Sequence, residues 1–197
     1  MNGSDDSSDV NGSDKSLGSN GSALAWTNSD LLLYHGTDDD AADRIVRGGV
    51  DLTKCSPLAD FGRGFYTTTN FEQAKNWASL KAKRISRKRK SARGAVLGMA
   101  VDRNWLGKLD SLAFVRSAAE VDYPTFVRFC RGGCSPHRPS GDYQVVYGPV
   151  AQWQNIADPN FSLFIIQDCD QISFHNDAVT GSSSVLLAKV NLVWSEK

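Results

Sequence analysis

The sequence predicts a single domain of the mixed α+β class. Short apolar or alternating runs recur between turn residues, few segments show helical spacing, and strands do not alternate with helices as in βαβ units. A doubly wound nucleotide-binding fold is therefore not expected. With 197 residues and 41% hydrophobic content, the chain can bury one sizeable core.

Two strands are expected near the start of this domain. Residues 31–34 form a short apolar run that ends at Gly36, where the backbone can turn and approach a ligand closely. This spacing places His35 at the end of the first strand. Residues 65–69 follow a glycine-rich turn and combine aromatic with β-branched side chains, which favours a second strand that carries Tyr66.

A helix is expected directly after the second strand. Asn70 can cap its first turn, and the apolar residues that follow, Trp77 among them, recur at helical spacing on one face. Trp77 then faces back toward the second strand. The helix is expected to continue into a basic run, residues 81–93, and to fray near Gly94.

The remaining elements are short. Apolar patterning and turn residues predict a buried strand, a short helix, three further strands and a last apolar segment. These are expected at residues 95–101, 123–129, 143–150, 161–166 and 172–174, and in the segment that ends at Trp194. The sequence contains no internal repeat.

Three features together resemble the catalytic core of the diphtheria-toxin and poly-ADP-ribose-polymerase branch of ADP-ribosyltransferases. In that branch the first strand supplies a His followed by Gly, as in His35-Gly36. A Phe-Gly-basic-Gly-aliphatic-Tyr string then leads, after ten further positions, to a second aromatic residue; here these are residues 61–66 and Trp77. The resemblance implies a split antiparallel β-sheet core with flanking helices.

The resemblance also implies roles for these residues in binding NAD, which would be the substrate. His35 would hydrogen-bond the adenosine ribose, and the backbone of Gly36 would hold the nicotinamide carboxamide. Tyr66 and Trp77 would enclose the nicotinamide ring, and such aromatic pairs contribute about 0.5–1.5 kcal/mol beyond burial. Supporting contacts are implied for Thr37, Arg63 and Thr67.

The third motif of the best-studied transferases is a Glu at the start of a late strand, and here Gln171 takes that place. A neutral amide can orient a ribose hydroxyl but cannot act as a base, and losing one preorganised electrostatic group costs about 2.7–4 kcal/mol of transition-state stabilisation. Elongation into a polymer is therefore not expected, and Gln171→Glu is expected to raise turnover. Asp142 is the alternative third residue, with Glu120 and Asp170 as further acidic candidates.

Gln171 is favoured over Asp142 by its position along the chain and by a second resemblance. Residues 142–151 and 170–175 are similar to a family of small fungal and bacterial proteins of unknown function, placed near the ADP-ribosyltransferases.

The formal net charge is +0, but the charges are unevenly distributed. Residues 1–29 are rich in Gly, Ser, Asn and Asp and are expected to be a disordered acidic leader, before a domain at residues 30–197. No apolar signal segment or stretch of about 20 apolar residues occurs, which predicts an intracellular protein, cytoplasmic or nuclear. The basic run from Lys81 to Arg93 fits a nuclear-import signal, a nucleic-acid contact or a solvated helix end.

No metal site is expected. Cys130, Cys134 and His137 lie close together in the sequence, but the spacing lacks a second ligand pair of the usual zinc-binding form. Without a secretion signal, the four cysteines are expected to be reduced thiols.

The sequence thus predicts an NAD-dependent mono-ADP-ribosyltransferase that releases nicotinamide and modifies an unknown protein, nucleic-acid or small-molecule acceptor. Three alternatives stay open: an NAD glycohydrolase, a non-catalytic NAD- or ADP-ribose-binding module, and a nuclear interaction protein that uses its basic helix. The oligomeric state is also left open.

Overall fold

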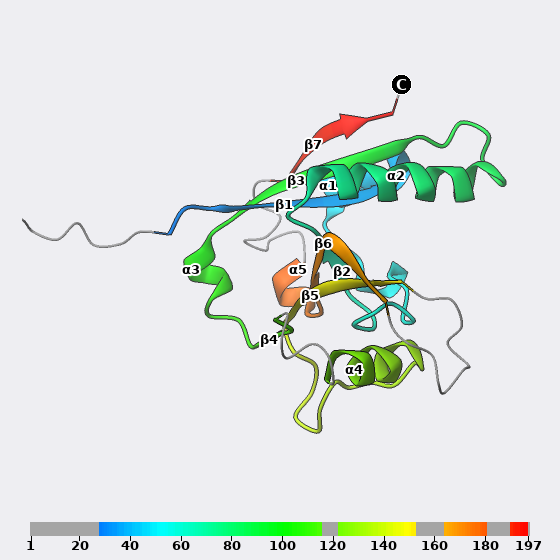
Figure 1. Ribbon diagram of the computed structural model, residues 1–197. Coiled ribbons are helices and arrows are strands. Elements are labelled where there is room, and N and C mark those ends of the chain that lie inside the picture. Colours follow the sequence, from blue (N-terminus) through cyan, green and yellow to red (C-terminus); the bar gives the residue numbers. More distant parts are fainter. Residues whose placement is uncertain (1–27, 116–121, 153–163, 181–189, 197) are drawn as a thin grey trace, which may run out of the picture.

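The computed structural model describes residues 28–115, 122–152, 164–180 and 190–196 (Figure 1). Within these ranges the chain is of mixed α+β class, as predicted, with two sheets and several helices. The expected leader falls almost entirely on residues 1–27, outside the described residues, and so does Glu120.

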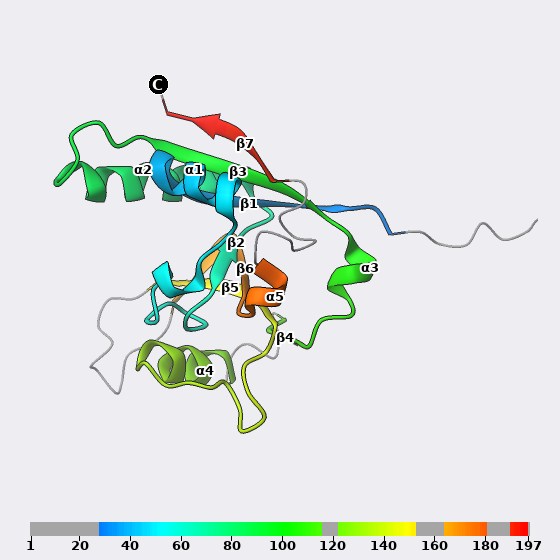
Figure 2. The same ribbon diagram turned by 180° about the vertical axis from the view of Figure 1, so that it is seen from behind.

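The first sheet has three antiparallel strands in the order β1-β3-β7. They are β1 (Leu31–Asp38), β3 (Gly94–Val101) and β7 (Val190–Ser195). Two helices, α1 (Asp39–Gly48) and α2 (Phe71–Ser86), lie beside this sheet (Figure 2). Because side chains alternate along β3, Leu97 packs with α1 and Val96 packs with α2, which buries the central strand on both faces.

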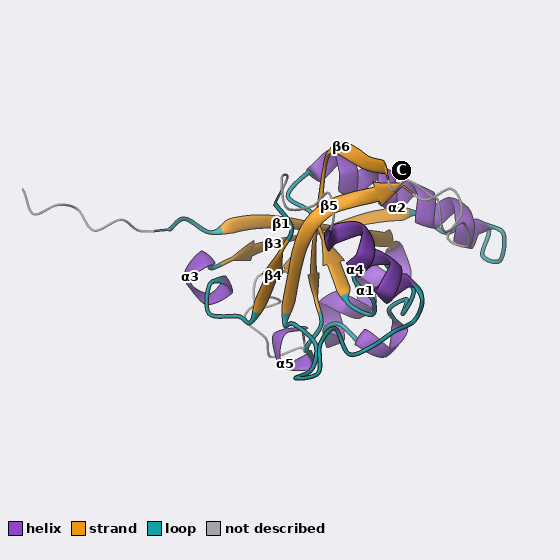
Figure 3. Ribbon diagram, turned by 60° about the horizontal axis from the view of Figure 1, so that its bottom comes forward, coloured by secondary structure: helices purple, strands orange, loops and turns teal. Residues whose placement is uncertain are grey.

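The second sheet has four strands in the order β2-β6-β5-β4. They are β2 (Phe65–Thr67), β6 (Phe164–Phe174), β5 (Val145–Gln152) and β4 (Ser111–Ala113). The β2–β6 and β5–β6 pairs are antiparallel, whereas β4 joins β5 in parallel (Figure 3). Helix α4 (Asp122–Arg131) packs Tyr123 and Val127 against an aromatic cluster under this sheet.

Among the described residues, one backbone bridge joins the two sheets. Tyr34 of β1 and Thr68, just after β2, exchange two hydrogen bonds of 2.8 and 2.9 Å. Behind this bridge one core draws side chains from both sheets, such as Leu33 and Met99 from the first and Phe174 from the second. The arrangement is a split sheet whose halves diverge on either side of one contact.

Helix α2 begins as the sequence predicts but ends earlier. The side chain of Asn70 caps it by accepting a hydrogen bond from the Gln73 backbone at 3.1 Å. Gln73 does not complete a capping box; its Nε2 donates to the backbone of Asp170 at 2.7 Å and ties the helix to β6. The basic run leaves the helix after Ser86, because Arg89 turns back to pair with the acidic first turn of α1.

Three other expectations about secondary structure need correction. The chain does not turn at Gly36, since β1 stays paired with β3 as far as Asp38. Asp38 then caps α1, a helix that the sequence reading missed, and Gly49 ends it with φ 82° and ψ −176°, a backbone conformation that favours glycine. The two late strands expected near 161–166 and 172–174 are one strand, β6, which has a register shift against β5 and a positive φ at Asp168.

Three shorter helices complete the described part of the chain. They are η1 (Leu52–Lys54), α3 (Arg103–Leu106) and α5 (Asp177–Thr180).

Helix α2 approaches β1 so closely that Gly36 has no room for a side chain. A Cβ atom added at Gly36 would lie 2.1 Å from the backbone oxygen of Ala74, whereas one at Gly48 would meet nothing within 4 Å. We therefore expect Gly36→Ala to lower the free energy of unfolding by about 1–3 kcal/mol. Gly48→Ala is the matched control in helix α1 and should be neutral or stabilising by about 0.5–1 kcal/mol. Urea unfolding of both variants would test this, and equal stabilities would contradict it.

Candidate functional site

A cavity of about 560 Å³ opens where the two sheets diverge, between β1, β2, α2 and β6. Six residues singled out from the sequence line it together, although they come from four elements. They are His35, Gly36, Tyr66, Thr67, Trp77 and Gln171.

The backbone groups of Gly36 face the gap between the sheets. Tyr34 uses its N–H and C=O for the bridge to Thr68, and backbone groups two residues apart on a strand point to the same edge. β1 is the outer strand of its sheet, and no described strand pairs with that edge beside Gly36. Gly36 therefore presents one donor and one acceptor to a ligand in the cavity.

His35 is held across the gap as a neutral imidazole. Its Nδ1 lies 2.6 Å from the backbone oxygen of Tyr66, and because a carbonyl only accepts, Nδ1 carries the proton. Burial lowers the pKa of His35 to about 4, against the opposing effect of that hydrogen bond. At neutral pH the free Nε2 can accept a hydrogen bond from a hydroxyl group, but the ring offers no positive charge.

Tyr66 contributes its ring to the cavity and its hydroxyl group to the fold. The hydroxyl donates to the backbone oxygen of Gly62 and accepts from the backbone of Phe61, both at 2.8 Å. Burial raises the pKa of Tyr66 far above its ordinary value, so the phenol stays protonated. The Phe61–Gly62 turn is thereby fixed, and the aromatic face of Tyr66 remains the part available to a ligand.

Trp77 stands on α2 at the edge of the same cavity and is 44% exposed. An indole that exposed is not needed to fill the core. Its face is therefore available to stack on a planar ligand.

The amide of Gln171 is oriented by two acceptors. Its Nε2 donates to Oδ2 of Asp60 at 2.7 Å and to the backbone oxygen of Pro149 at 2.8 Å. Since neither partner can donate, the nitrogen must face them, and the carbonyl oxygen of Gln171 is turned away from both.

Asp60 is a buried carboxylate that sequence reasoning did not find. It is 5% exposed and pairs with Arg131 of α4, whose Nε donates to Oδ1 at 2.7 Å. The backbone of Ala151 donates to Oδ2 at 3.3 Å. The one sequence signal for Asp60 is its position just before the glycine-rich string. Its partners Arg131, Ala151 and Gln171 lie far away in the sequence, so no local pattern indicates them.

Two proposed site residues, Arg63 and Thr37, and the alternative third residue, Asp142, lie elsewhere. Arg63 donates to the backbone oxygens of residues 52, 53 and 55 and holds the η1 loop in place. Thr37 is buried and lines a neighbouring, smaller cavity instead. Asp142 accepts from the backbone of His137 at 2.8 Å and, unlike Gln171, shares neither cavity with His35 and Tyr66.

The described residues contain no group of three or more His, Cys, Asp or Glu side chains placed to hold a metal ion. The four cysteines are free thiols. Among the described helices, none is both long and apolar enough to cross a membrane.

A sequence profile for DUF3990, a family of proteins of unknown function, matches residues 31–178. The chain belongs to the DUF3990 family. The match spans β1 to α5 and includes every residue that lines the larger cavity. No curated protein and no solved structure matches the chain significantly.

Two partly buried histidines should make this DUF3990 protein less stable in acid. Burial lowers the pKa values of His35 and His175 to about 4, below their ordinary value of 6.5. The stabilisation from the neutral rings is complete above pH 6.5 and is lost as the pH falls from there toward 4. We expect each histidine to lower the free energy of unfolding by about 1–2 kcal/mol between neutral pH and pH 5, as measured by urea unfolding.

His175→Asn is the matched variant, because Nδ1 of His175 donates to the backbone of Arg63 at 2.8 Å and an amide can replace that donor. The acid-induced loss of stability should be roughly halved in this variant. If His175→Asn loses as much stability in acid as the wild-type protein, His175 does not contribute to the acid sensitivity.

The Asp60–Gln171 contact changes the expectation for Gln171→Glu. The new carboxylate would face Oδ2 of Asp60 and the backbone oxygen of Pro149, so that like charges meet and a donor is lost. We expect Gln171→Glu to destabilise the protein by about 3 kcal/mol and not to raise turnover.

The double variant Asp60→Asn/Gln171→Glu exchanges amide and carboxylate and should recover part of the lost free energy of unfolding. Gln171→Met should lower the free energy of unfolding less than Gln171→Glu does. A double-mutant cycle of unfolding free energies measures the coupling. Additive effects would show that the two side chains do not interact.

Proposed function

We propose that this protein is an NAD-dependent mono-ADP-ribosyltransferase, which transfers ADP-ribose from NAD to an acceptor and releases nicotinamide. The observation that supports it most is the convergence of His35, Gly36, Tyr66, Trp77 and Gln171 on one cavity. These are the positions at which the sequence resembles the ADP-ribosyltransferases, and their spacing in the chain does not by itself require them to meet.

The nicotinamide ring would lie between the faces of Tyr66 and Trp77. The backbone of Gly36 would hold the carboxamide, since it offers a donor and an acceptor at an unpaired strand edge. A ribose hydroxyl would donate to Nε2 of His35, whose other nitrogen is already committed to Tyr66. A cavity of about 560 Å³ is within the range of small-molecule and cofactor sites.

Catalysis would depend mainly on positioning and on weak electrostatic stabilisation. Departure of nicotinamide leaves an oxocarbenium-like ribose. The carbonyl oxygen of Gln171 would accept from a ribose hydroxyl, and the hydrogen bond from its amide nitrogen to Asp60 makes that oxygen a better acceptor.

Arg131 balances the charge of Asp60, so this cluster does not supply the unpaired carboxylate of the best-studied transferases. Slow transfer of single ADP-ribose units fits such a site better than polymer elongation. The neutral Gln171 also supports one alternative from another class, a module that binds NAD or ADP-ribose without turnover.

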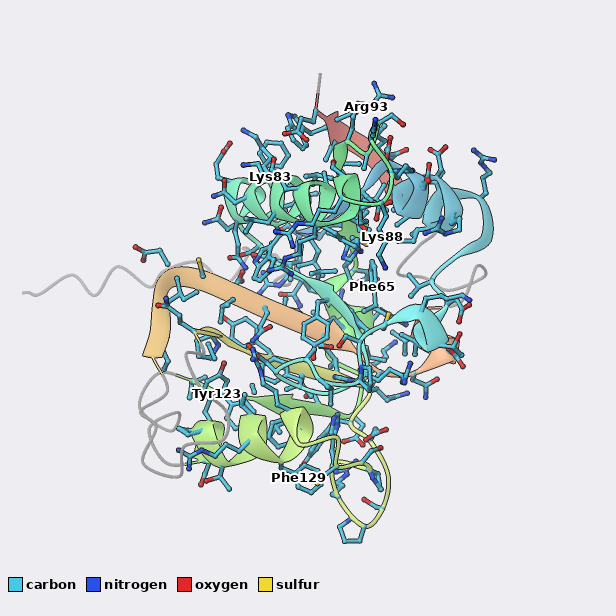
Figure 4. All side chains as sticks on the ribbon, turned by 90° about the vertical axis from the view of Figure 1, so that its right-hand side faces the viewer. Phe65, Lys83, Lys88, Arg93, Tyr123 and Phe129 are labelled. Carbon is cyan, nitrogen blue, oxygen red and sulfur yellow. The ribbon has the colours of Figure 1, made fainter. Side chains whose placement is uncertain are left out.

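The structure divides the basic run, which weakens the case for a single nucleic-acid patch. Lys81 and Arg84 line the larger cavity, and Arg89 is paired with Asp39 and Asp40 of α1. Lys83 and Lys88 are exposed on the part of the molecule that lies opposite the aromatic cluster of α4 (Figure 4).

The test is to incubate the purified protein with NAD and to measure free nicotinamide and ADP-ribose by chromatography. We expect nicotinamide release, and roughly a tenfold loss of kcat/KM in Trp77→Ala, because one stacking face is removed. Leu80→Ala is the matched control: Leu80 is 47% exposed on the same helix but does not line the cavity, so its activity should be unchanged.

Equal amounts of nicotinamide and free ADP-ribose would identify a glycohydrolase, since water then captures the ribosyl cation. Calorimetric binding of NAD without release, in the presence of candidate acceptors, would identify a binding module. Absence of both binding and release would overturn the proposal.

A further inference from the structure

A second cavity of about 300 Å³ borders the larger cavity at His35. The smaller cavity lies between α1, η1 and β2, and Ile45, Val50 and Phe65 give it an apolar wall. The two cavities share the residues His35, Ser56, Ala59, Tyr66 and Lys81. They are therefore neighbouring compartments with a common boundary.

Lys81 is the only cation among these shared residues, and it is held in place. Its Nζ donates to Oγ1 of Thr37 at 2.8 Å and lies 3.9 Å from Oδ2 of Asp38. The side chain is 46% exposed, so the ammonium group also reaches the cavity space and has capacity for further acceptors. Lys81 is thus a positioned cation at the junction of the two compartments.

Other cations face the same junction from both sides. Arg44 and Lys54 line the smaller cavity, and Arg84 lines the larger one without a hydrogen bond or ion pair to any described residue. Burial lowers the pKa of Lys81; the charges of Asp38 and Cys55 oppose this effect, and the charge of Arg44 adds a smaller lowering. Two carboxylates also line the cavities, Asp51 in the smaller one and Asp60 in the larger one, where Asp60 is paired with Arg131. The basic side chains that line the two cavities therefore outnumber the acidic ones.

We propose that the two cavities together hold one dinucleotide, with Lys81 binding its diphosphate at the junction and the smaller cavity holding the adenosine half. This inference rests on the proposed function, because it assigns the nicotinamide half to the larger cavity. Arg84 and Arg44 flank the diphosphate from either side. The proposal also gives the beginning of the basic run a role in ligand binding.

Calorimetry with ADP as the probe tests the role of Lys81. We expect Lys81→Met to weaken ADP binding about tenfold and to reduce the salt dependence of the affinity, because one charge–phosphate contact is lost. Lys83→Met is the matched control, since Lys83 is exposed on the same helix and lines neither cavity. Adenosine, which has no phosphate, should bind equally to both variants and to the wild type.

Two further variants separate charge from structure. Lys81→Arg keeps the charge and should restore most of the ADP affinity, whereas Lys81→Gln keeps a donor for Thr37 and should not. If Lys81→Met, Lys81→Gln and Lys83→Met all bind ADP like the wild type, the assignment of Lys81 is wrong. If the wild-type protein still binds NAD in that case, the proposed function remains intact. If the wild-type protein binds neither NAD nor ADP, both the role of Lys81 and the proposed function are overturned.

The smaller cavity is tested separately by filling it. Ala41 of α1 lines this cavity but not the larger one, so Ala41→Phe should block the adenosine half. We expect ADP binding to fall at least tenfold while binding of free nicotinamide is unchanged. Unchanged ADP binding in this variant would place the adenosine half outside the smaller cavity.

Discussion

The single bridge between Tyr34 and Thr68 is the constraint from which the rest of the site follows. Two backbone hydrogen bonds join the sheets there, and β1 and β2 separate immediately beyond it. A continuous sheet would have used the backbone of Gly36 for pairing and would have filled the space with side chains. Because the two sheets separate here, the edge of β1 stays unpaired by any described strand, and the hydrogen bond from His35 to Tyr66 crosses the gap. The cavity is a consequence of incomplete strand pairing.

Helix α2 closes one side of that gap and explains several unusual features at once. It packs against β1 so closely that its backbone at Ala74 excludes any side chain at Gly36. Its exposed indole, Trp77, then stands beside the open strand edge, and one turn later Lys81 reaches Thr37 at the far end of β1. Glycine at that strand position is therefore needed for packing. A single helix thereby supplies both an aromatic face and a cation to neighbouring parts of the site.

The cluster around Gln171 shows why a neutral side chain lies beside a buried carboxylate. Gln171 donates to Asp60, and Asp60 is balanced by Arg131, so the cluster requires an amide at this place. A second carboxylate would be opposed by the first, which is buried and already paired. The local charge arrangement, rather than the loss of a catalytic group alone, accounts for the residue found there. The cluster also offers less unbalanced negative charge to the cavity than a free carboxylate would.

The sequence by itself determined those features that depend on neighbours in the chain. Periodicity and capping placed β1, β2 and the start of α2, because hydrogen bonds and side-chain spacing over a few residues decide them. The tertiary structure alone decided that β1 continues past Gly36, that β6 is one strand, and that Asp60 and Arg131 meet Gln171. It also separated Asp142 from the cavity and brought Lys81 into it. These contacts join residues far apart in the chain, and their energies arise only when the sheets and α2 pack together, so no local pattern records them.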